Sequence, residues 1–154
     1  SDARHNPLQN TVPSLAGTSY KSQYGAVATV HPLATQAAAN QLENGGNAID
    51  AVIAAALTLG VVDSYNSGIG GGLFAVVHWA DGRIEAIDAR EMAPAKAHRD
   101  MYVRDGKVQR SLSRDGALAI GIPGSVAAFE YLSTVGGETA LATLYRQAAD
   151  IAES

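Results

Sequence analysis

The chain has 154 residues, 47% of them apolar, and its 11 Lys and Arg against 15 Asp and Glu give a formal net charge of -4. This composition is sufficient for one globular core and excludes a disordered tail or a fibre. The negative net charge, with basic residues scattered along the chain, argues against nucleic acid as a partner. No apolar run reaches the roughly 18 to 20 residues of a membrane span. The lack of cysteine excludes disulfides.

The first part of the chain predicts a strand and then a helix. Residues 1–24 combine prolines with many polar residues and show no regular period, so we expect an irregular lead-in. The apolar, β-branched run Gly25–Val30 predicts a strand. A helix should then run from Pro32 to about Asn44, because proline fits the first turn of a helix. His31, just before it, is interpreted as a capping or packing residue.

A second helix is expected directly after the first. The stretch Asn44-Gly45-Gly46 supplies a glycine for the left-handed conformation that often ends a helix, and Asn47 can cap the next one. Apolar residues then recur at helical spacing on one face, which predicts extensive burial: Ile49, Val52, Ile53, Ala56, Leu57 and Gly60. With 16 glycines and only 6% aromatic residues, the chain favours helices that pack through small side chains.

The second half predicts a β-hairpin and two further helices. Two apolar runs, 73–79 and 84–87, flank Asp81-Gly82, a typical hairpin turn. Residues 104–107 mark another turn, and residues 117–120 predict a strand. Helices are expected over 125–135 and 141–152, and the last one lacks a stop signal, so we expect the parent chain to continue beyond residue 154. The order of elements is mixed α and β, and it disfavours a Rossmann topology.

Few residues are arranged for chemistry. The glycine run 68–72 leads into a strand and lacks the dinucleotide and phosphate-loop patterns, so we interpret it as allowing close backbone approach, with the preceding helix as the expected neighbour. The histidines show no metal-ligand spacing, and His78 is interpreted as a hydrogen-bonded structural residue. No seryl nucleophile motif is present. We therefore expect no metal, no cofactor and no catalytic residue in this chain.

Arg90 is the best single candidate for a binding residue. It follows the second hairpin strand directly, where a guanidinium can present two parallel N–H groups to a carboxylate. From spacing alone, a structural ion pair with Asp88 or Glu91 is the competing interpretation. Lys96 and Arg99 are interpreted as surface residues.

Five stretches in order resemble the N-terminal part of the large subunit of γ-glutamyltranspeptidases and the related cephalosporin (glutaryl) acylases. They are GAVATVHPLAT at 25–35, ENGGNAIDA at 43–51, SGIGGG at 67–72, IDAREMAPA at 87–95 and GIPGSVAA at 121–128. Leu73 departs from the fourth glycine that many members have there. The resemblance extends from residue 25 to about 152.

The resemblance implies an α+β fold, namely part of the αββα sandwich of N-terminal nucleophile hydrolases, with residues 25–154 forming the N-terminal portion of that domain. It also implies a precursor that cleaves itself, and a Thr nucleophile at the start of a small subunit, outside this chain. Within the family motif, Arg90 matches the arginine that binds the α-carboxylate of the γ-glutamyl group. Glu91 is then expected to fix the loop.

The implied activity is γ-glutamyl transfer or hydrolysis on glutathione and related compounds, with the small subunit as partner and a periplasmic or secreted location by family analogy. The sequence leaves a cytoplasmic location open. Two alternatives also stay open: an acylase acting on glutaryl or cephalosporin amides, and a non-catalytic γ-glutamyl or amino-acid binding domain that retains Arg90.

Overall fold

The computed structural model describes residues 19–154 as two compact units. Within this range, the helical unit comprises residues 19–69 and 127–154, and the hairpin unit comprises residues 70–126. Residues 1–18, most of the expected irregular lead-in, lie outside the described residues.

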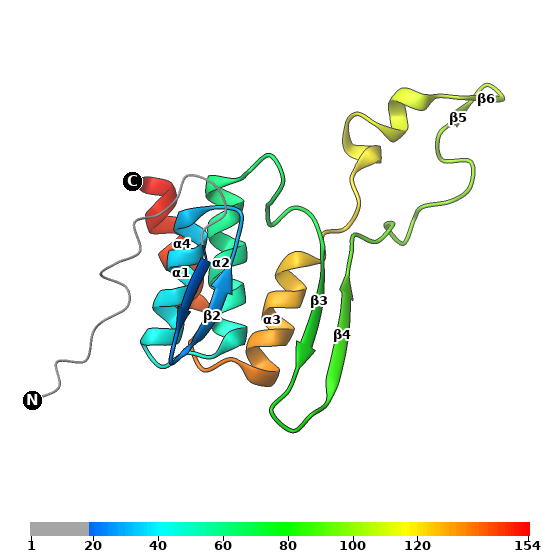
Figure 1. Cartoon of the computed structure of the whole chain (residues 1–154). Helices are drawn as coiled ribbons and strands as arrows, with labels where there is room; N and C mark the ends of the chain where they lie inside the picture. Colours follow the sequence, from blue (N-terminus) through cyan, green and yellow to red (C-terminus); the bar gives the residue numbers. More distant parts are fainter. Residues whose placement is uncertain (1–18) are drawn as a thin grey trace, which may run out of the picture. The chain divides into compact units, whose positions relative to one another are not determined.

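The helical unit begins with a small antiparallel hairpin. Strand β1 (Ser19–Ser22) pairs with β2 (Gly25–Ala28), with Ser22 opposite Gly25 (Figure 1). The end of the lead-in is therefore a strand, and the expectation of an irregular segment is wrong for residues 19–22. Pairing with β2 gives these residues backbone hydrogen-bond partners, a contact that the local residue pattern does not reveal.

Helices α1 (Pro32–Glu43) and α2 (Ala48–Val62) form as the sequence predicts. His31 caps α1, and its Nδ1 accepts a hydrogen bond from the Leu33 N–H at 3.2 Å. Gly45 adopts a φ of +91°, as expected for the residue that ends α1. Asn47 caps α2, and Asp50 completes a reciprocal capping box.

Small side chains join α1 to α2. Four alanines form a buried cluster, against which Val27, Leu42 and Leu59 pack: Ala34, Ala38, Ala51 and Ala55. This confirms the prediction of packing through small residues. The expected apolar face of α2 is buried at Ile49, Ile53 and Leu57, whereas Val52 is 53% exposed. Among the six residues of this face, Val52 is therefore the one that stays exposed.

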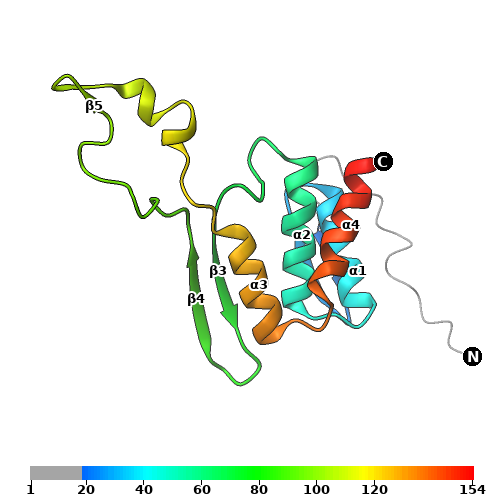
Figure 2. The same ribbon diagram turned by 180° about the vertical axis from the view of Figure 1, so that it is seen from behind.

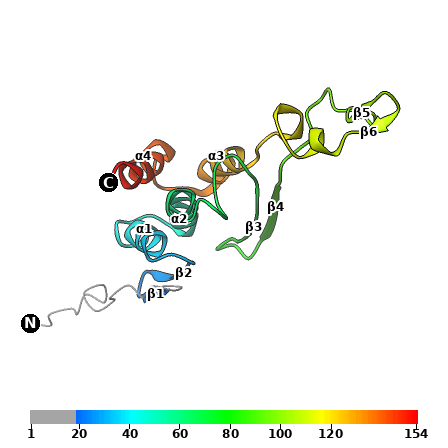
Figure 3. The ribbon, with the colours of Figure 1, turned by 90° about the horizontal axis from the view of Figure 1, so that it is seen from above.

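Helices α3 (Ser125–Gly136) and α4 (Leu141–Glu153) complete the described chain, and both were predicted. Helix α4 packs beside α2 with Leu144 and Ala148 buried (Figures 2 and 3). The loop between α3 and α4 is fixed by Asp50, which is 1% exposed. Its carboxylate accepts hydrogen bonds from the backbone N–H groups of Glu138 and Thr139 at 3.0 to 3.1 Å.

The hairpin unit is built on strands β3 (Leu73–His78) and β4 (Ile84–Ala89), which pair antiparallel with Leu73 opposite Ala89. Side chains alternate in exposure along both strands, as a half-covered sheet requires. The hairpin prediction is thus confirmed. Its geometry places the residue after β4, Arg90, beside the start of β3.

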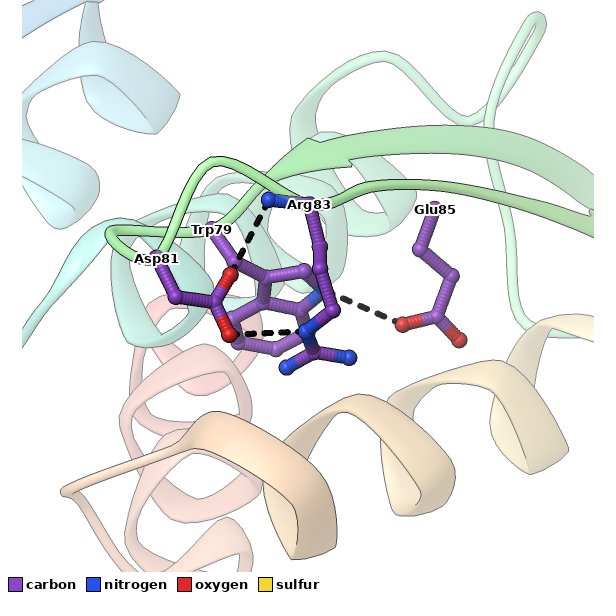
Figure 4. Close-up of polar contacts among 4 residues, drawn as sticks. All are labelled: Trp79, Asp81, Arg83 and Glu85. Atoms are coloured by element: carbon purple, nitrogen blue, oxygen red, sulfur yellow. Dashed lines mark hydrogen bonds and ion pairs between the residues drawn. The ribbon is translucent and has the colours of Figure 1, made fainter.

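Side chains fasten the tip of this hairpin (Figure 4). Arg83 Nε donates to Asp81 Oδ2 at 2.7 Å, and its guanidinium carbon lies 5.7 Å from the centre of the Trp79 ring. Trp79 Nε1 in turn donates to Glu85 at 3.1 Å. Gly82 takes a φ of +88°, which explains the glycine at this turn.

Between β4 and α3 the chain makes an irregular excursion. It contains strands β5 (Val103–Arg104) and β6 (Lys107–Val108), and two short 3-10 helices, η2 (Arg110–Ser113) and η3 (Ala117–Ala119). The turn expected at residues 104–107 is confirmed. The strand predicted over 117–120 is wrong: residues 117–119 form η3, with the Ala119 N–H bonded to the Gly116 carbonyl at 3.1 Å. Because no described strand pairs with residues 117–119, this local hydrogen bond takes the place of the bonds that a neighbouring strand would form.

The described chain contains both helices and antiparallel strands, so the α+β class is confirmed. Among residues 19–154, no helix has the length and apolar character needed to cross a membrane. The same residues contain no group of three His, Asp or Glu side chains suited to a metal ion.

Candidate functional site

Arg90 makes three side-chain contacts within the hairpin unit. Its Nη1 donates to the Gly72 carbonyl at 3.0 Å, and its Nη2 forms an ion pair with Glu91 Oε2 at 3.0 Å. The guanidinium carbon lies 5.7 Å from the centre of the Phe74 ring. These contacts hold the guanidinium from three sides, and its side chain is still 48% exposed.

The backbone at Arg90 is fixed as firmly as the side chain. The Asp88 carboxylate accepts the Arg90 N–H at 3.0 Å, which stabilises the turn out of β4. Met92 exchanges two backbone hydrogen bonds with Ile122, at 2.7 and 3.1 Å. The chain around Arg90 is thereby anchored on both sides.

Glycines allow three segments to meet at this point. A Cβ on Gly72 would lie 2.5 Å from the Ala89 carbonyl oxygen and 2.7 Å from the Arg90 Cα. A Cβ on Gly124 would collide with the same Ala89 oxygen. The Gly124 N–H also donates to the Gly71 carbonyl at 3.0 Å. Residues 71–72, 89–92 and 121–124 therefore pack backbone against backbone.

The glycine run thus allows close approach, as predicted, but with two different neighbours. A Cβ on Gly60 of α2 would lie 3.5 Å from the Gly68 Cα, an ordinary contact with the expected helix. The tight approach is that of Gly72 to the chain after β4. All three converging segments contain residues of the family motifs, but the local residue pattern does not reveal that they converge. The glycines at positions 71, 72, 121 and 124, in two of the three segments, were the available signal.

The other candidate residues have different roles. Glu91 pairs with Arg90, which agrees with the expectation that it fixes the loop. Lys96 and Arg99 are exposed, as predicted. His78 lies on the exposed face of β3 with Val76, and its imidazole forms no hydrogen bond within residues 19–154, so the predicted structural bond is not found there.

The arrangement suits recognition of a carboxylate. A guanidinium has five N–H donors, and two of those of Arg90 are engaged by Gly72 and Glu91. The remaining donors are sufficient for a bidentate contact, and the fixed position lowers the entropy lost on binding. Phe74 was not predicted as a site residue, because an aromatic residue in an apolar run gives no sign that it stacks on an arginine.

Comparison with known proteins decides the family. The gamma-glutamyltranspeptidase family profile matches residues 34–154. The chain belongs to the gamma-glutamyltranspeptidase family. It is similar to glutathione hydrolase 2 of Arabidopsis thaliana, with 43% identity over 120 residues, covering 78% of this chain and 20% of the relative. It is equally similar to the glutathione hydrolase proenzyme of Escherichia coli, with 43% identity over 110 residues, 71% of this chain and 19% of the relative.

Solved structures agree with this assignment of the chain to the gamma-glutamyltranspeptidase family. Helicobacter pylori gamma-glutamyltranspeptidase superposes with a TM-score of 0.79 at 41% identity, covering 86% of this chain and 38% of that one. The cephalosporin acylase of Bacillus halodurans gives 0.65 at 29% identity, covering 79% and 22%. The chain therefore spans about a fifth of the length of its curated relatives.

Proposed function

We propose that this chain is the substrate-anchoring part of an enzyme that cleaves γ-glutamyl amide bonds by hydrolysis or transfer. The observation that supports this proposal most directly is the fixed, half-exposed guanidinium of Arg90 in a chain of this family. Arg90 binds the α-carboxylate of the γ-glutamyl group. The small subunit of the same precursor supplies the nucleophile, a threonine outside this chain.

Anchoring at the α-carboxylate serves catalysis through orientation. A bidentate contact at the non-reacting end of the γ-glutamyl group fixes the position of its γ-carbonyl, several bonds away. The threonine, activated by its own α-amino group, then attacks a carbonyl that is held in place. Arg90 is in this scheme a substrate-binding residue and transfers no proton.

We further propose that the hairpin belongs to the αββα sandwich of N-terminal nucleophile hydrolases. One face of the β3–β4 sheet exposes large apolar side chains, with Phe74, Val76 and Ile84 each at least 70% exposed. Covering such a face with a second sheet lowers the free energy of the folded protein, because apolar surface is removed from water. The additional polypeptide that the longer relatives contain is the source of that sheet.

An acylase acting on glutaryl or cephalosporin amides is the second candidate, because a cephalosporin acylase is among the similar structures. The donor separates the two functions: a γ-glutamyl group carries an α-amino group that a glutaryl group lacks.

By family analogy we propose that the enzyme acts in the periplasm or outside the cell, which fractionation of the source cells tests.

The deciding experiment expresses the complete gene and records an intact mass spectrum under denaturing conditions, followed by assays with γ-glutamyl and glutaryl anilides. We expect two polypeptides, the smaller one beginning with threonine, and release of anilide from the γ-glutamyl donor. Release from the glutaryl donor alone would transfer the assignment to the acylase. An uncleaved product that binds glutathione without turnover would establish the non-catalytic binding domain instead.

A further inference from the structure

Positive charge is concentrated in one segment of this acidic chain. Residues 94–118 carry six Lys and Arg against three Asp, whereas the whole chain has 11 against 15. The impression that basic residues are scattered is therefore wrong for this segment. Its six cations are Lys96, Arg99, Arg104, Lys107, Arg110 and Arg114.

A pocket of about 260 Å³ lies within this segment, entirely in the hairpin unit. Its polar side chains are those of Lys96, His98 and Arg104, and no carboxylate lines it. Met101 and Leu118 supply apolar walls. Among the described residues, neither Lys96 nor Arg104 forms an ion pair with an acidic side chain. The pocket thus presents unmatched positive charge.

Hydrogen bonds build the walls of this pocket. The Tyr102 hydroxyl donates to the Leu118 carbonyl at 3.0 Å, joining the two sides of the excursion. Arg104 Nη1 donates to the carbonyls of Met101 and Val103 at 3.0 and 2.7 Å, so its guanidinium is held in place. A cation that is already positioned binds an anion at a lower entropic cost.

The pocket begins close to the candidate site. Pro94, which lines it, follows Arg90 by four residues, and a fully extended chain of that length spans at most about 14 Å. A tripeptide is about 10 Å long when extended. The length of such a peptide is thus of the same order as the largest possible distance between the Cα atoms of Arg90 and Pro94.

We propose that the pocket of Lys96, His98 and Arg104 is a second anion-binding subsite, which takes the C-terminal carboxylate of a small peptide substrate. The proposal rests on the γ-glutamyl activity proposed above. The carboxylate belongs either to the leaving group of the donor or to the peptide acceptor. Lys96 and Arg104 attract it by charge, and the pocket thereby favours peptides with a free C-terminus over amides.

The test uses the full-length processed enzyme and pairs each peptide with its C-terminal amide. In the donor arm, hydrolysis of glutathione is compared with that of glutathione amide. In the acceptor arm, a γ-glutamyl anilide donates to a dipeptide or to the dipeptide amide. We expect Lys96→Glu to lower the acid-to-amide ratio of kcat/KM about fivefold or more in one arm, and Lys96→Gln to lower it less.

Lys107→Glu is the matched control, because Lys107 is an exposed lysine of the same segment that does not line the pocket. It should change the ratio less than twofold, and about 0.5 M salt should reduce the Lys96 effect. Equal effects of the two variants, or an unchanged ratio in both arms, would overturn the subsite. Hydrolysis of the γ-glutamyl anilide, which has no leaving-group carboxylate, tests the proposed activity separately.

Discussion

Gly72 and Arg90 are linked twice, by the 3.0 Å hydrogen bond from Arg90 Nη1 to the Gly72 carbonyl and by a backbone approach that leaves no room for a Cβ on Gly72. The glycine therefore supplies both an acceptor for the guanidinium and the space in which the Arg90 backbone lies. Position 72 tolerates no side chain without movement of the arginine.

The first prediction is that Gly72→Ala impairs both stability and substrate binding. The new methyl group, 2.5 Å from the Ala89 oxygen, must displace backbone, at a cost of about 1 to 3 kcal/mol in the free energy of unfolding. Thermal unfolding and KM for a γ-glutamyl anilide measure the two effects. Gly70→Ala is the control, since a Cβ there meets nothing within 4 Å. Similar results for both variants would refute the role of close approach.

The second prediction concerns Arg90→Lys. Lysine keeps the charge but loses the planar pair of donors, so kcat/KM for the γ-glutamyl donor should fall about 10- to 100-fold. Steady-state kinetics of the full-length enzyme provide the measurement. Arg99→Lys, at an exposed arginine that makes only a 3.9 Å contact with Asp100, should leave kcat/KM near its original value. Activity close to that of the unaltered enzyme would remove Arg90 from the binding site.

A third prediction follows from the burial of Asp50. Asp50→Asn replaces one acceptor oxygen by an amide NH2 group, which then faces the N–H group of Asn47 if it replaces Oδ2, or that of Thr139 if it replaces Oδ1. The free energy of unfolding should fall by about 1 to 3 kcal/mol. Urea unfolding followed by circular dichroism measures this change. Asp150 lies on the exposed side of α4. For Asp150→Asn, the free energy of unfolding should fall by less than about 0.5 kcal/mol, the range of surface substitutions.

The fourth prediction is a pH effect at the hairpin tip. Hydrogen bonds from the side chain and then the backbone of Arg83 lower the pKa of Asp81 below its usual value of 3.8. Because the folded pKa is depressed, this stabilisation is present above the unfolded pKa and is lost as the pH falls through the folded pKa. An NMR titration of the Asp81 carboxyl should give a midpoint below 3.8, and Arg83→Gln should raise that midpoint. As a control, Arg99→Gln should leave the midpoint of the Asp81 titration as it is in the unaltered protein. An unchanged midpoint in Arg83→Gln would contradict the coupling of Asp81 to Arg83.

Elements with a local cause were predictable from the sequence. The caps of α1 and α2 depend on His31 and Asn47, whose side chains bond to N–H groups two or three residues away. The Asp81-Gly82 turn likewise fixes the β3–β4 hairpin from within. The expected strand over residues 117–120 failed, because an apolar run becomes a strand only where another strand pairs with it. Strand β1 was missed for the converse reason, since its partner β2 supplies the order.

The sequence by itself determined the family, through five motifs in order, and the identity of Arg90 as the candidate anchor. Only the tertiary structure decided that Gly72, Glu91 and Phe74 hold the guanidinium, and that Lys96 and Arg104 line one pocket with no carboxylate. The physical reason is that capping and turn geometry act over a few residues, whereas close approach and charge pairing depend on which distant segments the fold brings together.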